Sequence, residues 1–297
     1  MSNARGKVGI GIITYKRPDF FKNCYNSIPW DSIDVAVIVN DGPEYNFESL
    51  GITLNNKTTL IQHSTNLKLA KTKNDALKFL YNMDCEHIFV IEDDTVIIDT
   101  DVFKKYIDTS KKTGILHLNY GPGSPFNRKQ DNSIQYDLHN RHLCKQDSEP
   151  NPRAIVDYDN NISIALYQHT VAAFVYYNRK CLELAGFMDE DFDENAWEHV
   201  EHTYRIIKAG CHPAFWWFAD LTNSEHLIQS QKGAIDNSSI ATELDKPWEE
   251  QEWSKKVNRG IQLYKNKHGH APNMPPSSTL EQVKQQLKHI YKTYRQQ

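Results

Sequence analysis

Residues 88–98 read Ile-Phe-Val-Ile-Glu-Asp-Asp-Thr-Val-Ile-Ile, so three adjacent acids interrupt an apolar run. The acids are Glu92, Asp93 and Asp94. Neighbouring carboxylates repel one another and lose solvation on burial, which makes them costly at the end of a buried strand. Carboxylate oxygens are ligands that suit Mg²⁺ or Mn²⁺, and a bound cation would offset this cost. A solvated polar turn is the alternative, and the three residues alone favour neither.

The first half of the chain alternates strand and helix signals. Strands are predicted at Lys7–Thr14, Val35–Asn40, Thr59–Gln62 and His87–Glu92, and helices at Phe20–Ser27 and Leu69–Tyr81. Val35–Asn40 is nearly all apolar, which is typical of a parallel strand buried on both faces. The alternation predicts an α/β fold, Rossmann-like, with a mostly parallel central sheet flanked by helices. The acids then lie at the carboxyl edge of the sheet, where open α/β sheets bind ligands.

The second half begins with a segment of a different kind, Tyr120–Asp159, which is rich in glycine, proline and polar residues. It is too long for an ordinary connection, so we expect a functional loop or flap, or else a disordered insertion. Further elements are predicted at Gln168–Tyr177 (strand), Arg179–Ala185 (helix), Asn195–Ala209 (helix) and Ala214–Ala219 (strand). The predicted organisation is an α/β domain over 5–235, with a long loop or flap at 120–160, and a helical C-terminal extension over 236–297.

Composition limits the class of protein and its location. The chain has 297 residues and a net charge of −4, which gives no overall electrostatic footprint for nucleic acid. Its five cysteines are scattered, which favours reduced thiols and a cytoplasmic protein. No apolar run is long enough to span a membrane. A stripe of apolar residues near the C-terminus, flanked by four basic residues, could rest on an anionic membrane surface or pack on the catalytic domain.

A second group of charged residues is predicted on a helix near residue 200. Glu198, Glu201, His202 and Arg205 share one face of this helix, and His199 lies to its side. Such a group could bind ligand hydroxyls and remove a proton. The alternative is a solvated face with ion pairs between residues four apart. Trp197 at the helix start could stack on a sugar ring or anchor the helix.

Positive and amide side chains gather between the third strand and its helix. They are Lys68, Lys71 and Lys73 with Asn66 and Asn74. Cations and amide donors at a sheet edge suit a diphosphate. Neither a P-loop nor a G-x-G-x-x-G motif occurs, so the phosphate loops of those folds are not expected.

The order of these segments resembles that of glycosyltransferases of the GT-A fold, particularly those like glycosyltransferase family 2, from about Val8 to His226. Four segments carry the resemblance: Ile13–Pro18 (ITYKRP), Asn40–Gly42 (NDG), Asn66–Asn74 (NLKLAKTKN) and Glu92–Asp94, which looks like the D-x-D motif. Downstream, Leu184–Phe192 resembles the family's lead into the acceptor site, and Trp197–Arg205 resembles its E-D-x-D/E…R helix.

The resemblance implies a metal-dependent transferase that uses a nucleoside-diphosphate sugar, with a UDP-sugar expected. The implied donor-binding residues are Thr14, Tyr15, Arg17, Asp41, Asn66, Lys71, Asn74, Glu92 and Asp93. The implied ligands of Mn²⁺ or Mg²⁺ are Asp94 and His226. The metal would offset charge on the leaving nucleoside diphosphate. Trp197, His202 and Arg205 are the implied acceptor-binding residues.

The catalytic base is the point at which the chain departs from the family pattern. His199 stands where inverting members carry an aspartate, and an imidazole can remove a proton near neutral pH. Glu198 or Glu201 could act instead, and an enzyme that retains configuration would need no such base. The expected enzyme is a hexosyl- or pentosyltransferase, with inversion favoured.

Several functions remain open from the sequence. A glycan or a lipid-linked sugar is the favoured acceptor. A phage-type enzyme acting on modified DNA bases is an alternative, because the loop Asn127–Lys145 carries basic residues that could meet phosphates. These basic-loop residues are Arg128, Lys129, Arg141, His142 and Lys145. A nucleotidyltransferase is also compatible with the pattern, as is an inactive sugar-binding module on the same fold.

Overall fold

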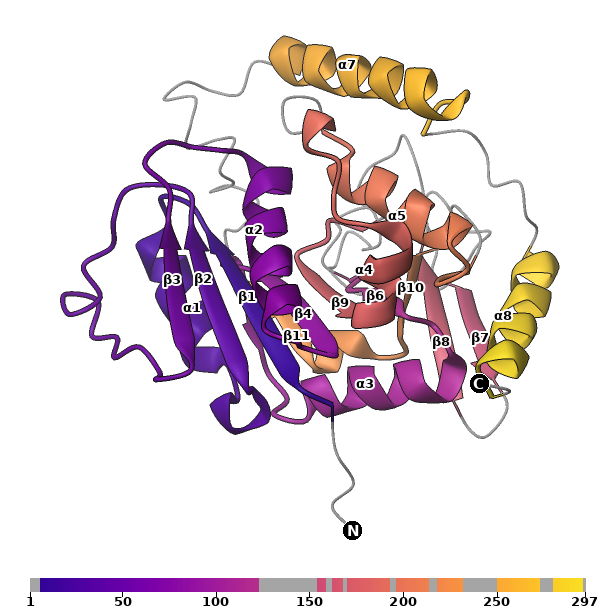
Figure 1. The fold of residues 1–297 in the computed structure, drawn as a ribbon, viewed down its shortest axis with the longest axis horizontal. Helices are drawn as coiled ribbons and strands as arrows, with labels where there is room; N and C mark the ends of the chain where they lie inside the picture. The colour runs from indigo at the N-terminus through magenta and orange to yellow at the C-terminus, as the bar shows by residue number, and fades with distance from the viewer. Residues whose placement is uncertain are drawn as a thin grey trace. The chain divides into compact units, whose positions relative to one another are not determined.

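The apolar run before the acid triplet forms a strand, and this strand belongs to a parallel sheet (Figure 1). In the computed structural model four neighbouring strands of this sheet lie in the order β3 (Thr58–Gln62), β2 (Val35–Asn40), β1 (Val8–Thr14) and β4 (His87–Glu92). All three neighbouring pairs are parallel. Their carboxyl ends therefore meet at one edge, and Glu92 lies opposite Ile13 there.

The chain is divided into two compact units. The structure describes residues 6–122, 154–158, 162–167, 170–192, 196–213, 218–231, 250–272 and 280–295. The first unit comprises residues 1–97, 186–203 and 230–274, and the second comprises residues 98–185, 204–229 and 275–297. The parallel sheet lies in the first unit.

Helices cover the sheet of the first unit because its strands are apolar on both faces. Every residue of β1 and β2 is buried. Helix α2 (Leu69–Asn82) packs on β1 and β2, and α1 (Pro18–Ser27) contacts β1 (Figure 1). Gly11 allows α2 to approach closely, because a Cβ there would lie 2.7 Å from Ala76 Cβ. The α/β fold with a mostly parallel sheet flanked by helices is confirmed.

Five further elements complete the first unit. They are η1 (Trp30–Ser32), β5 (Thr95–Ile97), η4 (Glu190–Phe192), the start of α5 (Glu198–Lys208) and α7 (Glu250–His268). Helix α7 is anchored by Tyr264, which is 0% exposed and has its ring in an edge contact with Phe192. Lys267, near the end of α7, forms ion pairs with Asp189 and Asp191. Part of the predicted C-terminal extension thus packs on the segment that leads into α5.

The second unit is mixed. It contains α3 (Val102–Thr113), β6 (His117–Asn119), β7 (Ala154–Tyr158), β8 (Ile162–Tyr167), β9 (Phe174–Asn178), α4 (Arg179–Ala185), β10 (Phe218–Leu221), η5 (Ser224–His226), β11 (Ile228–Ser230) and α8 (Leu280–Arg295). Strands β10, β8 and β7 form an antiparallel sheet, and β6 pairs antiparallel with β9. Helix α8 contacts α3, and its residues Val283 and Leu287 are 0% exposed.

Several element boundaries differ from those expected from the sequence. Strand β7 lies within the segment expected to be a loop, because its five residues pair with β8 although polar residues surround them. Helix α3 was not expected, although Val102, Phe103, Tyr106 and Ile107 recur at helical spacing on its buried side. Helix α5 begins at Glu198 rather than at Asn195. The basic residues of Asn127–Lys145 and the first four of Ala214–Ala219 lie outside the described residues.

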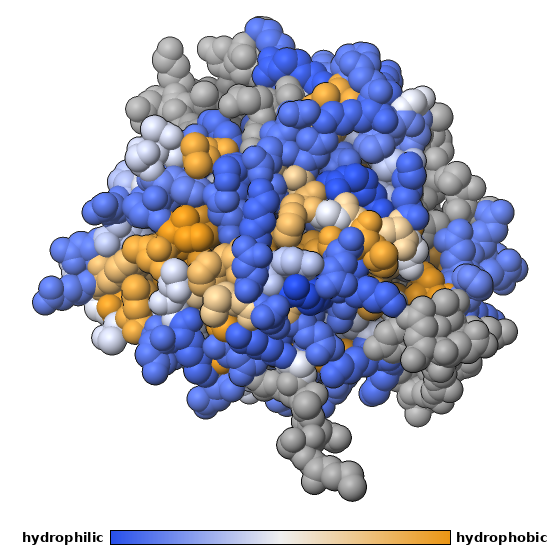
Figure 2. All heavy atoms as spheres, in the orientation of Figure 1, coloured by the Kyte–Doolittle hydropathy of each residue, from blue (hydrophilic) through white to orange (hydrophobic). Residues whose placement is uncertain are grey.

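The surface is largely hydrophilic on the face shown in Figure 2, and apolar residues gather there in patches. Leu60 on β3 is 40% exposed, and Leu67 before α2 is 37% exposed. Among the described helices, none combines the length and the apolar character that crossing a membrane requires.

Candidate functional site

The acid triplet lies at the carboxyl edge of the parallel sheet, as predicted. Strand β4 ends at Glu92, and the backbone N–H of Asp93 donates to Ile13 O at 3.0 Å. Lys73 pairs with Glu92, and Arg17 contacts both Asp93 and Asp94. The side chains of Glu92, Asp93 and Asp94 are 18%, 0% and 21% exposed, respectively.

Glu92 forms an ion pair with a buried lysine of α2. Lys73 Nζ lies 2.6 Å from Glu92 Oε1, and the Lys73 side chain is 0% exposed. Burial raises the pKa of Glu92, while the charge of Lys73 lowers it. The sequence pattern associates Lys73 with a diphosphate. In the structure its ammonium is instead buried in the first unit and pairs with Glu92.

The Asp93 carboxylate is buried and bound by the segment that follows β1. Thr14 Oγ1 donates to Asp93 Oδ2 at 2.7 Å, and Arg17 forms an ion pair with Asp93 Oδ1. Burial raises the pKa of Asp93 to about 7, although Arg17 and Thr14 lower it. Tyr45 adds to this arrangement, because its hydroxyl accepts from Arg17 N at 2.9 Å and lies 2.9 Å from Thr14 Oγ1. No sequence motif indicates Tyr45.

Asp94 is the most exposed acid of the triplet. Its side chain is 21% exposed, and its Oδ2 lies 3.4 Å from Arg17 Nη1. Within the described residues, no three His, Cys, Asp or Glu side chains gather as ligands for a metal ion. A Mg²⁺ ion that binds with phosphates often takes only one or two protein carboxylates, and phosphate oxygens and waters complete its shell. Asp94 fits this pattern as a single protein ligand, beside a guanidinium that suits phosphate.

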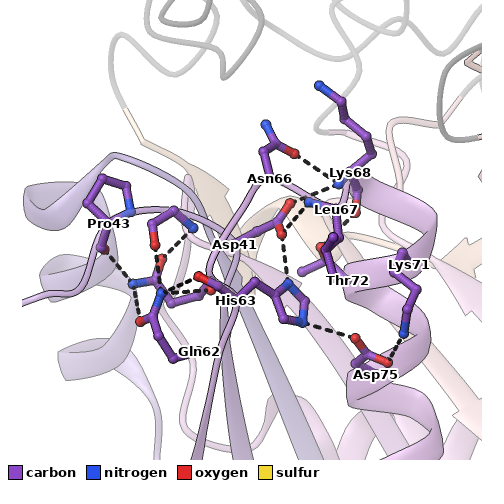
Figure 3. A network of polar contacts seen from close by, with 12 residues as sticks. Asp41, Pro43, Gln62, His63, Asn66, Leu67, Lys68, Lys71, Thr72 and Asp75 are labelled. Atoms are coloured by element: carbon purple, nitrogen blue, oxygen red, sulfur yellow. Dashed lines mark hydrogen bonds and ion pairs between the residues drawn. The ribbon is translucent and has the colours of Figure 1, made fainter.

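A second polar network lies beyond β2 and β3 (Figure 3). The Asp41 carboxylate accepts hydrogen bonds from the backbone N–H groups of Leu67 at 2.8 Å and Lys68 at 3.0 Å. His63 Nδ1 lies 2.7 Å from Asp41 Oδ1. Tyr15 lies close by, because a Cβ on Gly42, the residue after Asp41, would be 3.0 Å from Tyr15 Cδ2.

The other predicted donor residues around α2 are held by protein groups. Asn66 Oδ1 accepts from Lys68 N at 2.9 Å, and Lys71 forms an ion pair with Asp75. Asn74 is buried. Its Nδ2 donates to Met188 O at 2.9 Å, and its Oδ1 accepts from Met188 N at 2.8 Å. Asn74 therefore ties α2 to the segment before α5.

The start of α5 pairs an acid with an imidazole. His199 Nδ1 lies 3.1 Å from Glu198 Oε1, and the side chains are 19% and 9% exposed, respectively. Burial raises the pKa of Glu198, but the charges of His199 and Lys73 outweigh it and hold this pKa at about 2. Glu198 is thus a carboxylate that stays ionised and holds the His199 ring.

The remaining residues predicted on this helix have structural partners. Glu201 is 1% exposed and lies 3.2 Å from His268 Nε2. His202 Nε2 lies 2.9 Å from Gly186 O, and Trp197 Nε1 donates to Val257 O at 3.3 Å. Trp197 therefore anchors the helix start to α7.

Two predicted site residues lie in the second unit. Arg205 Nη1 donates to Ala185 O at 2.5 Å, and His226 is the last residue of η5. The other predicted site residues all lie in the first unit.

The sequence pattern did not single out His63 as a site residue, although a signal for it exists. His63 follows β3 directly, just as Asp41 follows β2 and Asp93 follows β4. Polar residues directly after parallel strands lie at the ligand-binding edge. His63 belongs to this group by position.

No protein-family model matches the sequence, and no curated protein sequence matches it. Solved structures do match the fold. GalNAc-T7, in a structure with UDP, GalNAc and Mn²⁺, has a TM-score of 0.50 at 8% identity, over 99% of this chain and 57% of that one. Staphylococcus aureus TarS has a TM-score of 0.48 at 14% identity, over 87% and 43% of the respective chains. The mannosyltransferase PcManGT from Pyrobaculum calidifontis, with GDP-Man and Mn²⁺, has a TM-score of 0.48 at 9% identity, over 99% and 83%.

This chain therefore spans less than half the length of TarS and just over half that of GalNAc-T7. The likeness to GalNAc-T7 shows the fold: the chain has the mixed α/β architecture of GT-A glycosyltransferases.

Proposed function

We propose that the protein transfers a sugar from a nucleoside-diphosphate sugar to an acceptor hydroxyl with the help of a divalent cation. The observation that carries the proposal is the set of contacts that the three acids of the triplet make. Glu92 and Asp93 are bound by Lys73 and Arg17, while Asp94 is the most exposed. Asp94 is thus an accessible carboxylate next to the Arg17 guanidinium at the ligand-binding edge, whereas Glu92, which is 18% exposed, is bound to Lys73.

The donor would lie along this edge. Asp94 would hold Mn²⁺ or Mg²⁺, and Arg17 would contact the diphosphate. The cation, when bound, stabilises negative charge on the leaving nucleoside diphosphate. Asp41, Tyr15 and the turn at Asn66 would contact the nucleoside. UDP is the favoured nucleotide from the resemblance, and GalNAc-T7 was captured with UDP and Mn²⁺.

His199 is the proposed base for an inverting reaction. The Glu198 carboxylate is 9% exposed and its Oε1 lies 3.1 Å from His199 Nδ1, so it is placed to hold the imidazole rather than to take the proton itself. Glu201 is buried and lies against His268. The imidazole of His199 would take the proton of the acceptor hydroxyl, and Glu198 would orient the ring through Nδ1. The acceptor is proposed to be a glycan or a lipid-linked sugar.

Product analysis tests the proposed reaction. Purified protein is incubated with a panel of UDP- and GDP-sugars and Mn²⁺, with and without chelator, and the released phosphate compounds are identified. Release of nucleoside diphosphate that stops on chelation supports the proposal. Release of pyrophosphate would instead indicate a nucleotidyltransferase. Binding of a nucleotide sugar without transfer or hydrolysis would indicate an inactive sugar-binding module.

A further inference from the structure

The turn that precedes α2 is held in a strained backbone conformation. Lys68 has φ 73° and ψ 175°, a combination that residues other than glycine rarely adopt. Such a conformation persists only where its surroundings determine it, and strained residues of this kind cluster at ligand-binding sites. The contacts that hold Lys68 are therefore informative about function.

Hydrogen bonds hold both the backbone N–H and the backbone carbonyl of Lys68. Its N–H donates to Asp41 Oδ2 at 3.0 Å and to Asn66 Oδ1 at 2.9 Å, and its carbonyl accepts from Thr72 Oγ1 at 2.6 Å. The preceding residue, Leu67, also donates its N–H to Asp41, at 2.8 Å. The Asp41 carboxylate is thus the main anchor of the turn (Figure 3).

His63 holds Asp41 in turn, and is itself held by a second carboxylate. His63 Nδ1 lies 2.7 Å from Asp41 Oδ1, and Nε2 lies 3.0 Å from Asp75 Oδ2. Each ring nitrogen of His63 thus lies within hydrogen-bond distance of a carboxylate oxygen. Figure 3 shows the ring between the two acids, with Lys71 on the far side of Asp75.

These contacts join four polar side chains in a row from the end of β2 to the first turns of α2. The row is Asp41, His63, Asp75 and Lys71. The His63 side chain is 8% exposed and that of Asp41 is 7% exposed, so water screens the pair weakly.

We propose that His63 is a positioning residue for the donor nucleotide. His63, which Asp75 holds from the other side, fixes the Asp41 carboxylate. Asp41 in turn keeps the turn over residues 66–68 in the conformation that contacts the nucleobase. This inference rests on the proposed function. Asp41 already accepts three hydrogen bonds of the roughly four that a carboxylate can accept. It would therefore offer the base a single, fixed acceptor position.

Binding of two probes separates positioning from a general effect on folding. UDP and GDP each carry a nucleobase and a diphosphate, whereas inorganic pyrophosphate carries no base. With Mn²⁺ present, His63→Leu is expected to raise the Kd of the tighter-binding nucleotide about tenfold or more, while the Kd of pyrophosphate stays within about twofold. Asp75→Asn, which keeps an acceptor for His63 but removes the charge, is expected to give a smaller loss in the same direction.

His87→Leu is the matched control. His87 is a buried histidine at the start of β4, at the other end of the sheet from the triplet. The His87→Leu substitution is expected to leave the Kd of both probes unchanged. Equal nucleotide affinity in folded His63→Leu and wild-type protein would overturn the inference, and so would equal losses for nucleotide and pyrophosphate. If His63→Leu does not fold, the same comparison on Asp75→Asn decides.

Amide hydrogen exchange tests the positioning role without any ligand. The N–H groups of Leu67 and Lys68, which donate to Asp41, are expected to exchange faster in His63→Leu than in wild-type protein. Unchanged exchange would contradict the inference even if no nucleotide binds. Failure of the wild-type protein to bind UDP or GDP would instead contradict the proposed function, so the two failures can be told apart.

Discussion

Lys73 Nζ lies 2.6 Å from Glu92 Oε1, and this ion pair joins α2 to the carboxyl end of β4. The same ammonium also acts on Glu198, because its charge adds to that of His199 in lowering the pKa of Glu198 against the effect of burial. One buried lysine thus balances an acid beside the proposed donor site and an acid beside the proposed base.

Removal of this lysine charge is expected to destabilise the protein strongly. Lys73→Met leaves Glu92 without its counter-charge, and breaking a buried ion pair from one side costs about 3–5 kcal/mol. The free energy of unfolding in urea measures this loss. Lys71→Met is the matched control, because the Lys71 side chain is 33% exposed and its pair with Asp75 should contribute at most about 1 kcal/mol. Equal losses in the two variants would contradict this account of Lys73.

Glycine at position 68 is expected to stabilise the fold. The backbone angles of Lys68 cost of order 1–3 kcal/mol for a residue with a Cβ, whereas glycine adopts them without strain. Glycine adds entropy to the unfolded chain worth roughly 0.5–1 kcal/mol, so a net gain of about 1 kcal/mol is expected for Lys68→Gly.

Lys111→Gly is the control for this substitution. Lys111 is an exposed residue late in α3, where glycine should cost about 1 kcal/mol. The two variants are compared by urea unfolding. A loss of stability in Lys68→Gly of the same size as in Lys111→Gly would show that the turn is not strained.

The buried Asp220 of the second unit makes stability depend on pH. Burial raises its pKa to about 6, although the hydroxyls of Ser224 and Tyr106 and two backbone N–H groups lower it. The raised pKa favours the protonated form in the folded state. Its contribution to stability is therefore fully present below the unfolded-state pKa of about 4 and is lost as the pH rises through about 6.

Asp220→Asn tests this pH dependence. The variant cannot ionise, so the fall in unfolding free energy between about pH 4 and pH 7 should be smaller than in wild-type protein, by up to about 3 kcal/mol. Urea unfolding at a series of pH values measures the difference. Parallel stability curves for the two proteins would show that Asp220 does not titrate in this range.

Substitutions at the start of α5 distinguish the proposed base from the residue that orients it. His199→Asn is expected to lower kcat by about 10²–10⁴, because it removes the group that accepts the proton, while the Kd of the nucleotide stays the same. Glu198→Gln should lower kcat less, because the imidazole remains. His289→Asn on the exposed side of α8 serves as control. Wild-type kcat in His199→Asn would assign the reaction to another base or to retention of configuration.

The sequence predicts the parallel sheet and the edge at which the acids lie, because strand periodicity and the end of each strand are local features. The partners of the acids are not local. Lys73 lies 19 positions before Glu92, and its place on the buried side of α2 depends on how that helix packs on β1 and β2. The resemblance suggested that Lys71 and Asn74 face the donor, whereas both are bonded to protein groups, Asp75 and Met188. Long-range pairs of this kind follow from tertiary packing.

The central claim is that Asp94 binds a divalent cation during sugar transfer. The rate of nucleoside diphosphate release tests this claim most directly. Asp94→Asn is compared with wild type at saturating Mn²⁺ and donor, with Asp31→Asn, an exposed aspartate of η1, as control. Because a bound cation contributes several kcal/mol to charge stabilisation in the transition state, Asp94→Asn should release nucleoside diphosphate at least about 100-fold more slowly. Asp31→Asn should match wild type. Full activity in a folded Asp94→Asn variant would contradict the account.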